Sequence, residues 1–388
     1  MAPELLPVPP SQGGAIERWI RDAAVRLAER GHDVHVVARD HGDGAREHSA
    51  DGVRYHFVRI PPAIDRGAAA VVAKGLWYYS GVRRRLSRIR PDVVHHHSRP
   101  SGLWLSRPIA SRSRQVISLH SMEYGWAFGY GGWDRRLFRR GFAAADRVLC
   151  VSDFIRRHTV ERYPETDPRA LTVYNGVDGA LFSPAPAAGD GAQRTILYVG
   201  RVEERKGVHV LLDAFERHIA PRLPDVRLLI VGPHSYWNAE PSPYYRDVTA
   251  RCARNPRIEL RGPTYVDDDL ARIYREAAVS VVPSVFPEAL GLTSIEAQAS
   301  GVPVVVSTSG GLPETVSPGV SGLVFENGDH ERLADAVVDL LTDEPRRRAM
   351  AAAARAWALA RFSWDIIAAH LDDVYVSVLA TPSPEAAR

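Results

Sequence analysis

Two glutamates eight positions apart, Glu288 and Glu296, stand in the segment PEALGLTSIEAQASG. Two cationic residues, Arg201 and Lys206, follow an earlier apolar run that ends in YVG. Cations at this spacing suit a pyrophosphate, and carboxylates accept hydrogen bonds from hydroxyl groups such as a ribose diol. Gly291 precedes a helical pattern, whose first backbone N–H groups and positive end also favour phosphate. These residues together predict a site for a phosphorylated ligand that carries hydroxyl groups.

Four apolar runs in the second half of the chain would form the strands that carry these residues. They read TILYVG at 195–200, RLLIVG at 227–232, VSVVPS at 279–284 and PVVVS at 303–307. Amphipathic stretches such as DDDLARIYREA at 267–277 lie between them. Buried strands that alternate with helices are typical of a doubly wound parallel sheet, in which ligands bind at the carboxyl ends of the strands. We therefore expect Arg201 and Lys206 at a ligand-binding edge of such a sheet.

The first half of the chain shows the same alternation. Apolar side chains at helical spacing in 15–30 precede a strand-like run at 34–38, and similar runs follow near 93–94, 116–119 and 148–151. The stretch SPAPAAGDGA then resembles a linker. We therefore expect an α/β protein with a first domain at 1–182, a linker at 183–194, a second domain at 195–360, a helix at 361–380 that crosses back, and a disordered tail at 381–388.

The segment before the first helical pattern lacks a strand. MAPELLPVPPSQGG contains no apolar run that could form one. In a doubly wound sheet the first strand is central. We therefore expect either that the written chain begins late, a few apolar residues short, or that the sheet of the first domain is altered.

Composition and charge argue against several classes of protein. The chain has 388 residues, with 49 basic and 46 acidic side chains and a net charge of +3, which is too even to indicate a nucleic-acid partner. No apolar run approaches the ~20 residues of a membrane span, and no signal peptide is evident. Cys150 and Cys252 lack the spacing of a zinc site or a disulfide framework. The cytosol is the expected location.

Longer stretches around the candidate residues resemble a known enzyme family. The segments YVGRVEERKG, PEALGLTSIEAQASGVPVV, QGGAIE, VSDFI, VYNGVD and GGLPETV are similar to those of the family 4 retaining glycosyltransferases. The resemblance extends over nearly the whole chain. Within that family, LPVPPSQGGAIERW and SLHSMEYGW look most like the spore-coat polysaccharide type. The resemblance implies the GT-B fold, with two doubly wound Rossmann-like domains facing a central cleft.

The resemblance also implies roles for the charged residues of the second domain. Arg201 and Lys206 would bind the diphosphate of a nucleotide-sugar donor. Glu296 would bind the ribose of the donor, and Glu288 would bind hydroxyls of its sugar. The two glutamates would then fix hydroxyl groups and would not act as an acid and base pair.

The remaining implied contacts come from both domains. The backbone amides expected at the sugar or phosphate are those of Leu290, Gly291 and Leu292. Val266 would contact the base through its backbone. In the first domain, Gly13 and Gly14 would let a loop approach the donor, and His120 would reach the sugar from the opposite wall.

The mechanism that the resemblance implies needs no carboxylate nucleophile. The incoming hydroxyl would attack on the face from which the nucleotide leaves, and positioned cations and dipoles would stabilise the leaving diphosphate. No cofactor and no metal are implied, and a UDP-sugar is the first donor to consider. The acceptor would be a hydroxyl of an envelope glycan, a lipid-linked glycan or a small secondary metabolite. Two departures from the family pattern affect donor preference at most, because Leu290 replaces the usual aromatic residue and Gln298 the usual methionine.

Three other functions remain open. A glycoside hydrolase would use Glu288 and Glu296 as its carboxylate pair, but it would leave Arg201 and Lys206 without a role. A nucleotide-sugar epimerase of similar fold would convert its substrate without an acceptor. A non-catalytic nucleotide-sugar-binding protein would bind the donor without turnover.

A histidine run and an acidic pair each have a structural explanation as well as a functional one. His95, His96 and His97 are consecutive at a strand end, where side chains alternate between faces, so metal binding is disfavoured. Asp267 and Asp269 match a metal-binding pattern of another transferase fold, but they precede a helical pattern and are expected to cap it.

Two further segments concern the acceptor and the membrane. The basic run Arg83, Arg84, Arg85 and Arg88 would form a solvated helix face or a peripheral contact with anionic lipid. The aromatic loop at 122–133 would stack on an acceptor ring or pack as ordinary loop aromatics. The oligomeric state stays open.

Overall fold

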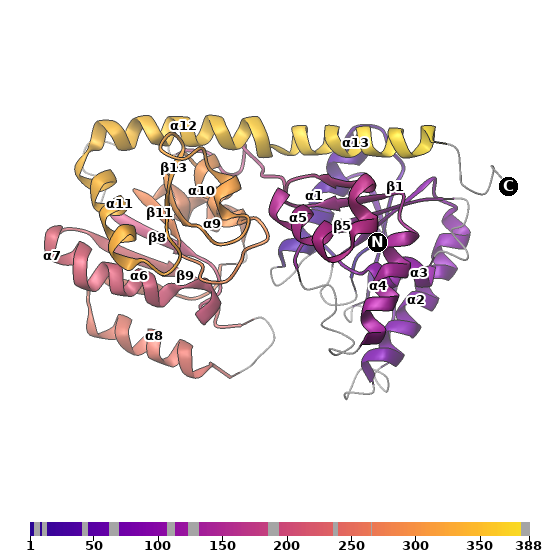
Figure 1. Ribbon diagram of the computed structural model, residues 1–388, viewed down its shortest axis with the longest axis horizontal. Coiled ribbons are helices and arrows are strands. Elements are labelled where there is room, and N and C mark those ends of the chain that lie inside the picture. Colours follow the sequence, from indigo (N-terminus) through magenta and orange to yellow (C-terminus); the bar gives the residue numbers. More distant parts are fainter. Residues whose placement is uncertain are drawn as a thin grey trace. The chain divides into compact units, whose positions relative to one another are not determined.

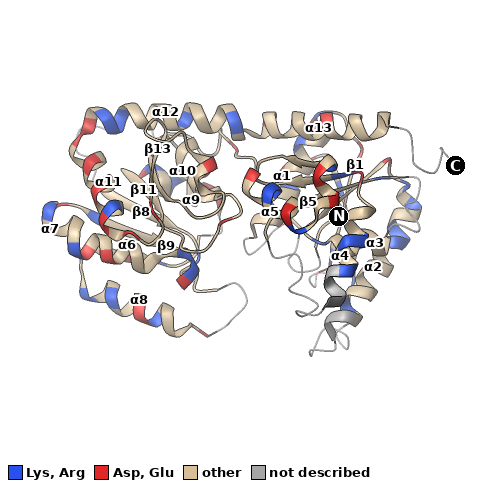
Figure 2. Ribbon diagram, viewed as in Figure 1, with Lys and Arg blue, Asp and Glu red and all other residues tan. Residues whose placement is uncertain are grey.

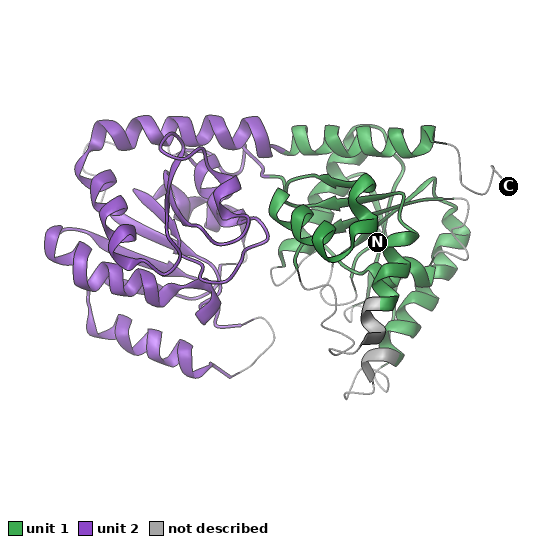
Figure 3. Ribbon diagram, viewed as in Figure 1, with its two compact units in different colours: residues 1–176, 364–388 green, residues 177–363 purple. Residues whose placement is uncertain are grey.

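The structure is a computed structural model that describes residues 1–3, 8–9, 14–40, 46–61, 70–106, 113–122, 132–184, 194–235, 240–264 and 266–381. The chain divides into two compact units (Figure 3). Unit 1 comprises residues 1–176 and 364–388, and unit 2 comprises residues 177–363. Each unit combines helices with parallel strands, so the expected α/β class is confirmed.

Unit 2 contains a six-stranded sheet whose neighbouring strands pair in parallel (Figure 1). The strands are β8 (Thr195–Val199), β9 (Arg227–Val231), β10 (Ile258–Arg261), β11 (Val279–Val282), β12 (Val304–Ser307) and β13 (Gly322–Phe325). The four predicted strands are confirmed, and β10 and β13 add to them. The strand order β10-β9-β8-β11-β12-β13 changes direction between β8 and β11. This switch point is where doubly wound sheets bind ligands.

The helices of unit 2 cover a core of buried aliphatic and aromatic side chains. They are α6 (Val208–Ala214), α7 (Ala220–Arg222), α8 (Pro243–Arg254), α9 (Asp267–Arg275), α10 (Leu292–Ala299), α11 (His330–Thr342) and α12 (Glu344–Phe362), with short turns at Glu204–Lys206, Phe215–Ile219 and Leu312–Thr315. The expectation that Asp267 and Asp269 cap α9 is wrong. Val266 is the N-cap residue, and both aspartates lie in the first turn. Their charges there complement the positive end of the helix.

Among its described residues, unit 1 contains two smaller sheets. The first has the order β1-β3-β2, with β1 (Val34–Arg39), β2 (Glu47–Ala50) and β3 (Val53–Val58). The second has the order β4-β5-β6-β7, with β4 (Val93–His97), β5 (Arg114–Leu119), β6 (Arg147–Cys150) and β7 (Ala170–Thr172). The accompanying helices are α1 (Ala15–Glu29), α2 (Ala70–Ile89), α3 (Pro100–Ser106), α4 (Gly132–Ala143), α5 (Asp153–Arg162), a 3-10 turn (Pro164–Arg169) and α13 (Trp364–Ala380).

The N-terminal residues lie between these two sheets. The Ala2 N–H donates to the Val37 carbonyl of β1 at 2.9 Å, and the Met1 amine donates to the His95 carbonyl of β4 at 2.6 Å. Residues 1–3 therefore contact both sheets at the place of a central strand without forming one. The two sheets of the described residues agree with an altered first sheet, which is one of the two expectations for this segment, whereas the other expectation, a chain that begins late, stays a prediction.

The chain passes between the units at Gly176 and again before α13. A Cβ on Gly176 would lie 2.3 Å from the ring of Trp364, so only glycine leaves room for that ring. Within unit 1, α13 packs against α1, where Asp372 forms an ion pair with Arg30 and a hydrogen bond with His32. This C-terminal helix thus belongs to unit 1 although unit 2 precedes it in the chain.

Candidate functional site

Two loops at the switch point of the unit 2 sheet bring the predicted residues together. One loop follows β8 and contains Arg201 and Lys206, and the other follows β11 and contains Glu288. Gly207 has a φ of 69°, and a Cβ there would lie 1.9 Å from the Pro283 carbonyl oxygen. Glycine therefore permits the close approach of the two loops, which neighbouring strands alone would not ensure.

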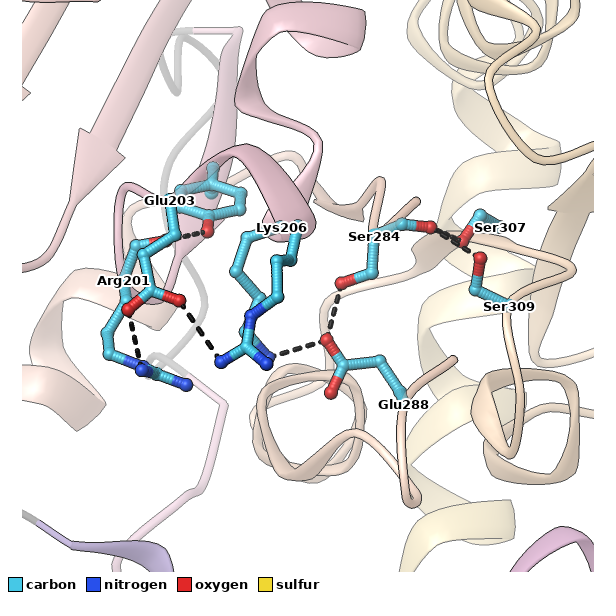
Figure 4. Close-up of polar contacts among 9 residues, drawn as sticks. Arg201, Glu203, Lys206, Ser284, Glu288, Ser307 and Ser309 are labelled. Carbon is cyan, nitrogen blue, oxygen red and sulfur yellow. Dashed lines mark hydrogen bonds and ion pairs between the residues drawn. The ribbon is translucent and has the colours of Figure 1, made fainter. Parts of the chain in front are cut away.

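Lys206 and Glu288 form a direct ion pair (Figure 4). The Lys206 Nζ lies 2.5 Å from Glu288 Oε1, and the Ser284 hydroxyl donates to the same carboxylate oxygen at 2.5 Å. The Ser284 carbonyl accepts hydrogen bonds from Ser307 and Ser309 at 2.7 and 2.6 Å. These buried serines fix the β11 loop from behind. The Glu288 carboxylate therefore has a defined position before any ligand binds.

The pKa of Glu288 reflects a balance of opposing effects. Burial raises the pKa of its carboxyl, but the charge and hydrogen bond of Lys206 and the Ser284 hydroxyl outweigh burial, so the pKa lies below its ordinary value. Glu288 is therefore ionised at neutral pH and accepts hydrogen bonds. A hydrolase pair needs one carboxylic acid with a raised pKa, so the geometry does not support Glu288 as that acid.

Arg201 also meets a carboxylate in this structure. Its Nη1 lies 2.6 Å from Glu203 Oε1 (Figure 4). Glu203 Oε2 lies 3.4 Å from Nη2 of Arg205. The buried Tyr198 side chain donates its hydroxyl to the Arg201 carbonyl at 2.7 Å. Both predicted cations thus lie at the switch point, each beside a glutamate. Figure 2 shows basic and acidic residues interspersed over both units. Because neither unit is covered by charges of one sign, an anion would be bound by a local group of cations such as this one.

Helix α10 begins at the predicted glycine turn. Gly291 is its N-cap residue with a φ of 109°, which favours glycine, and Leu292 is its first residue. Leu290 is buried with 1% exposure, so its side chain belongs to the core. The first-turn N–H groups of a helix lack partners within that helix, which agrees with the predicted phosphate contact.

The second glutamate lies within α10, where a tyrosine hydroxyl binds it. Glu296 is 5% exposed, and the hydroxyl of the buried Tyr274 donates to Glu296 Oε2 at 2.9 Å. Val266, the residue expected at the base, is 57% exposed in the loop after β10. Glu296 is therefore held by α9, whereas Val266 is open to solvent.

In unit 1 the predicted residues lie near the start of α1 and the end of β5. Gly14 is the N-cap residue of α1 with a φ of 116°, and Gly13 lies outside the described residues. His120 Nε2 is 3.0 Å from His97 Nδ1, and the ring of Trp19 packs on both. Burial lowers the pKa of His120 to about 3 and that of His97 well below its ordinary value. His120 is therefore a neutral hydrogen-bonding group at physiological pH.

Several residues of these sites were missed by sequence reasoning. In unit 2 they are Glu203, Ser284 and Tyr274, and in unit 1 they are Trp19 and His97. Glu203 stood between the two predicted cations, and Ser284 ended a predicted strand, so their positions offered a signal. Tyr274 and Trp19 looked like core residues of helices, and no local pattern distinguished them.

The other candidate motifs have structural roles or fall outside the description. No group of three or more His, Cys, Asp or Glu side chains suited to a metal was found among the described residues. His95 binds Tyr375 and Ser118, and His96 binds Gln115. Residues 123–131 of the aromatic loop lie outside the described residues, so the acceptor prediction there is untested.

The basic run lies on α2, but its members differ. Arg84 and Arg88 are exposed, whereas Arg83 is partly buried. The prediction that Arg85 belongs to this solvated face is wrong, because its guanidinium donates to the Phe57 carbonyl of β3. In the described part of the chain, no helix is long and apolar enough to cross a membrane.

Comparisons with known proteins identify the family and the fold of the chain. A family model described as Glycosyltransferase Family 4 matches residues 13–180, and one described as Glycosyl transferases group 1 matches residues 193–343. The chain is 26% identical to spore coat protein SA of Bacillus subtilis (strain 168), over 97% of this chain and 98% of that protein.

Two further proteins are similar over most of their length. The GDP-mannose-dependent alpha-(1-6)-phosphatidylinositol monomannoside mannosyltransferase of Mycobacterium tuberculosis (strain ATCC 25618 / H37Rv) is 30% identical over 94% of this chain and 95% of its own. The solved structure of Anabaena Alr3699/HepE in complex with UDP-glucose has a TM-score of 0.72 at 19% identity, covering 94% of this chain and 96% of that one. The chain therefore belongs to the family 4 glycosyltransferases of the GT-B fold.

Proposed function

We propose that the protein transfers a sugar from a nucleotide-diphosphate donor to an acceptor hydroxyl, with retention of the anomeric configuration and without a metal ion. The observation that carries this proposal is the contact between Lys206 and Glu288 at the switch point of the sheet. Lys206 lies on the same loop as Arg201. One site thus offers cations for a diphosphate and a carboxylate for sugar hydroxyls.

The proposed reaction breaks the bond between the anomeric carbon and the diphosphate oxygen. Negative charge develops on that oxygen, where Arg201 and Lys206 stabilise it. The acceptor hydroxyl attacks from the side on which the diphosphate leaves and passes its proton to the leaving phosphate. Because the two cations neutralise the diphosphate, we propose that no metal is required.

The remaining groups would position the donor. We propose that Glu296 binds the ribose and Val266 the base. We also propose that the backbone amides of Leu290, Gly291 and Leu292, at the start of α10, bind the sugar or the phosphates. Tyr274 supports this arrangement through its 2.9 Å hydrogen bond, which orients the Glu296 carboxylate. We further propose that Gly13, Gly14 and His120 of unit 1 contact the donor.

For the donor base we propose uracil first and guanine second. The solved Anabaena structure holds UDP-glucose, and the mycobacterial relative is named for GDP-mannose. For the acceptor we propose a hydroxyl of an envelope glycan, a lipid-linked glycan or a small metabolite. A peripheral contact with anionic lipid would use the exposed Arg84 and Arg88 of α2, and not Arg85.

Thermal-shift titration in EDTA would test the donor site first. UDP, GDP, ADP and dTDP, each with its common sugar nucleotides, would be added to the purified protein. A ligand that binds only the folded state at a hundredfold excess over Kd raises its stability by about 2.7 kcal/mol. We expect one base to give a clear shift, and the absence of any shift in a folded protein would contradict the proposal.

Two variants would then test the assigned roles. We expect Lys206→Ala to lower turnover by about 100-fold or more while the protein stays folded, because it removes a donor that stabilises the leaving diphosphate. We expect a loss of about the same size for Glu288→Ala, because it removes the acceptor that positions the sugar hydroxyls. Lys74→Ala is the matched control, because Lys74 is the other lysine of the chain and lies on α2. Near-wild-type turnover in either site variant would refute the role given to that residue.

A further inference from the structure

Glu203 bridges two arginines beside the proposed diphosphate site, and no donor contact has been assigned to it. Its carboxylate lies 2.6 Å from Arg201 and 3.4 Å from Arg205. The side chains of Glu203 and Arg201 are each 23% exposed, so the pair is reachable by a ligand in solvent. A guanidinium binds carboxylate and phosphate oxygens with the same N–H groups. Glu203 therefore occupies donors that a diphosphate would use.

The backbone around Glu203 is fixed. The neighbouring Val202 is fully buried, and its N–H donates to the Pro233 carbonyl at 2.9 Å. The Glu203 carbonyl accepts a hydrogen bond from the Lys206 N–H at 2.9 Å. The loop thus keeps the Glu203 side chain near both arginines. A ligand would replace the Glu203 carboxylate at the arginines through rotation of side chains, because the backbone is held.

Arg205 adds a third cation to this place. Its carbonyl accepts hydrogen bonds from the N–H groups of Val285 and Phe286 in the β11 loop, at 3.0 and 3.2 Å. Its guanidinium lies 5.3 Å from the ring centre of Phe286. These contacts place Arg205 on the same pair of loops as Arg201 and Lys206.

The charges of this cluster are unequal. Arg201, Arg205 and Lys206 supply three positive charges, whereas Glu203 and Glu288 supply two negative charges. A diphosphate that enters the site replaces one carboxylate contact of the arginines with phosphate contacts. The negative charge of Glu203 then remains close to the diphosphate and opposes its binding.

We propose that Glu203 is a built-in competitor of the diphosphate. It holds Arg201 and Arg205 in the empty site, yields them when the donor binds and recaptures them as the nucleoside diphosphate leaves. This inference rests on the proposed function and adds a means of product release to it. The product carries about one more negative charge than the donor, since its terminal phosphate ionises with a pKa of about 6. Without a competitor the three cations would retain the product.

Isothermal titration calorimetry of Glu203→Gln with UDP and with GDP, in EDTA, tests this inference. The amide keeps the size of the side chain and removes its charge. We expect the variant to bind the nucleoside diphosphate about five- to tenfold more tightly than the wild type, and to show stronger product inhibition. Glu204→Gln is the matched control, because Glu204 is an exposed residue of the same charge one position away. We expect its affinity to stay within about twofold of wild type.

Each outcome decides the matter. If Glu203→Gln binds no more tightly than the wild type, or binds more weakly, Glu203 is a positioning residue for Arg201 and the competitor role is refuted. An equal gain in Glu204→Gln would also refute it, because the effect would then be one of net charge. If neither wild type nor variant binds any nucleoside diphosphate, the proposed function fails and the inference fails with it. Binding by the wild type without a gain in the variant removes only the inference.

Discussion

Glu17 in unit 1 allows a quantitative prediction about stability and pH. It lies in the first turn of α1 and is 4% exposed. Burial raises the pKa of its carboxyl from 4.5 to about 7, although a backbone hydrogen bond at Glu17 acts in the opposite direction. One pKa unit corresponds to ~1.4 kcal/mol, so ionising this side chain in the folded state costs about 3 kcal/mol.

The sign of the change in stability with pH follows from which state binds the Glu17 proton more tightly. Between pH 4.5 and about 7 the folded state binds the Glu17 proton more tightly than the unfolded state does. The free energy of unfolding therefore falls as pH rises through this window, and the full penalty is present above about pH 7. We expect Glu17→Gln, which is neutral at every pH, to be more stable than wild type by up to about 3 kcal/mol at pH 8. At pH 4.5 the two proteins should differ little.

Urea unfolding at pH 5, 6, 7 and 8 would measure this difference. Hydrogen exchange of the α1 amides would assign the change to unit 1, because a protein with two units need not unfold in one step. Glu29→Gln is the matched control on the same helix, since Glu29 is exposed and ion-paired with Arg26. A stability difference between Glu17→Gln and wild type that does not change with pH would refute the reasoning.

Three further predictions concern unit 2, the passage between the units and metal independence. Tyr274→Phe removes the hydroxyl that donates to the buried Glu296, so we expect a loss of about 1–2 kcal/mol in thermal unfolding and weaker donor binding. Unchanged binding would argue against a donor role for Glu296. Gly176→Ala places a Cβ 2.3 Å from the Trp364 ring, and we expect a loss of about 1–3 kcal/mol, whereas Gly262→Ala, with nothing within 4 Å, should be near neutral. Activity should persist in EDTA, and loss of turnover that Mg²⁺ or Mn²⁺ restores would contradict metal independence.

Local patterns in the chain determined the alternation of helices and strands. Strands buried on both faces produce continuous apolar runs, so β8, β9, β11 and β12 could be read without any contact information. The helical spacing of apolar residues likewise located α1 and α9. Arg201, Lys206, Glu288 and Glu296 could be selected because charged residues that follow buried strands or glycine turns have few structural reasons to be there.

The partners of those residues were decided by the tertiary structure. Lys206 and Glu288 are 82 positions apart and meet only because β8 and β11 are neighbours in the sheet. Tyr274 and Glu296 come from different helices, so their contact also depends on tertiary packing. Glu203 lies close to Arg201 in the chain, but its contact with both arginines depends on side-chain geometry. Sequence periodicity reports the environment of each residue, whereas pairing depends on strand order and loop approach, which arise from the packing of the whole unit.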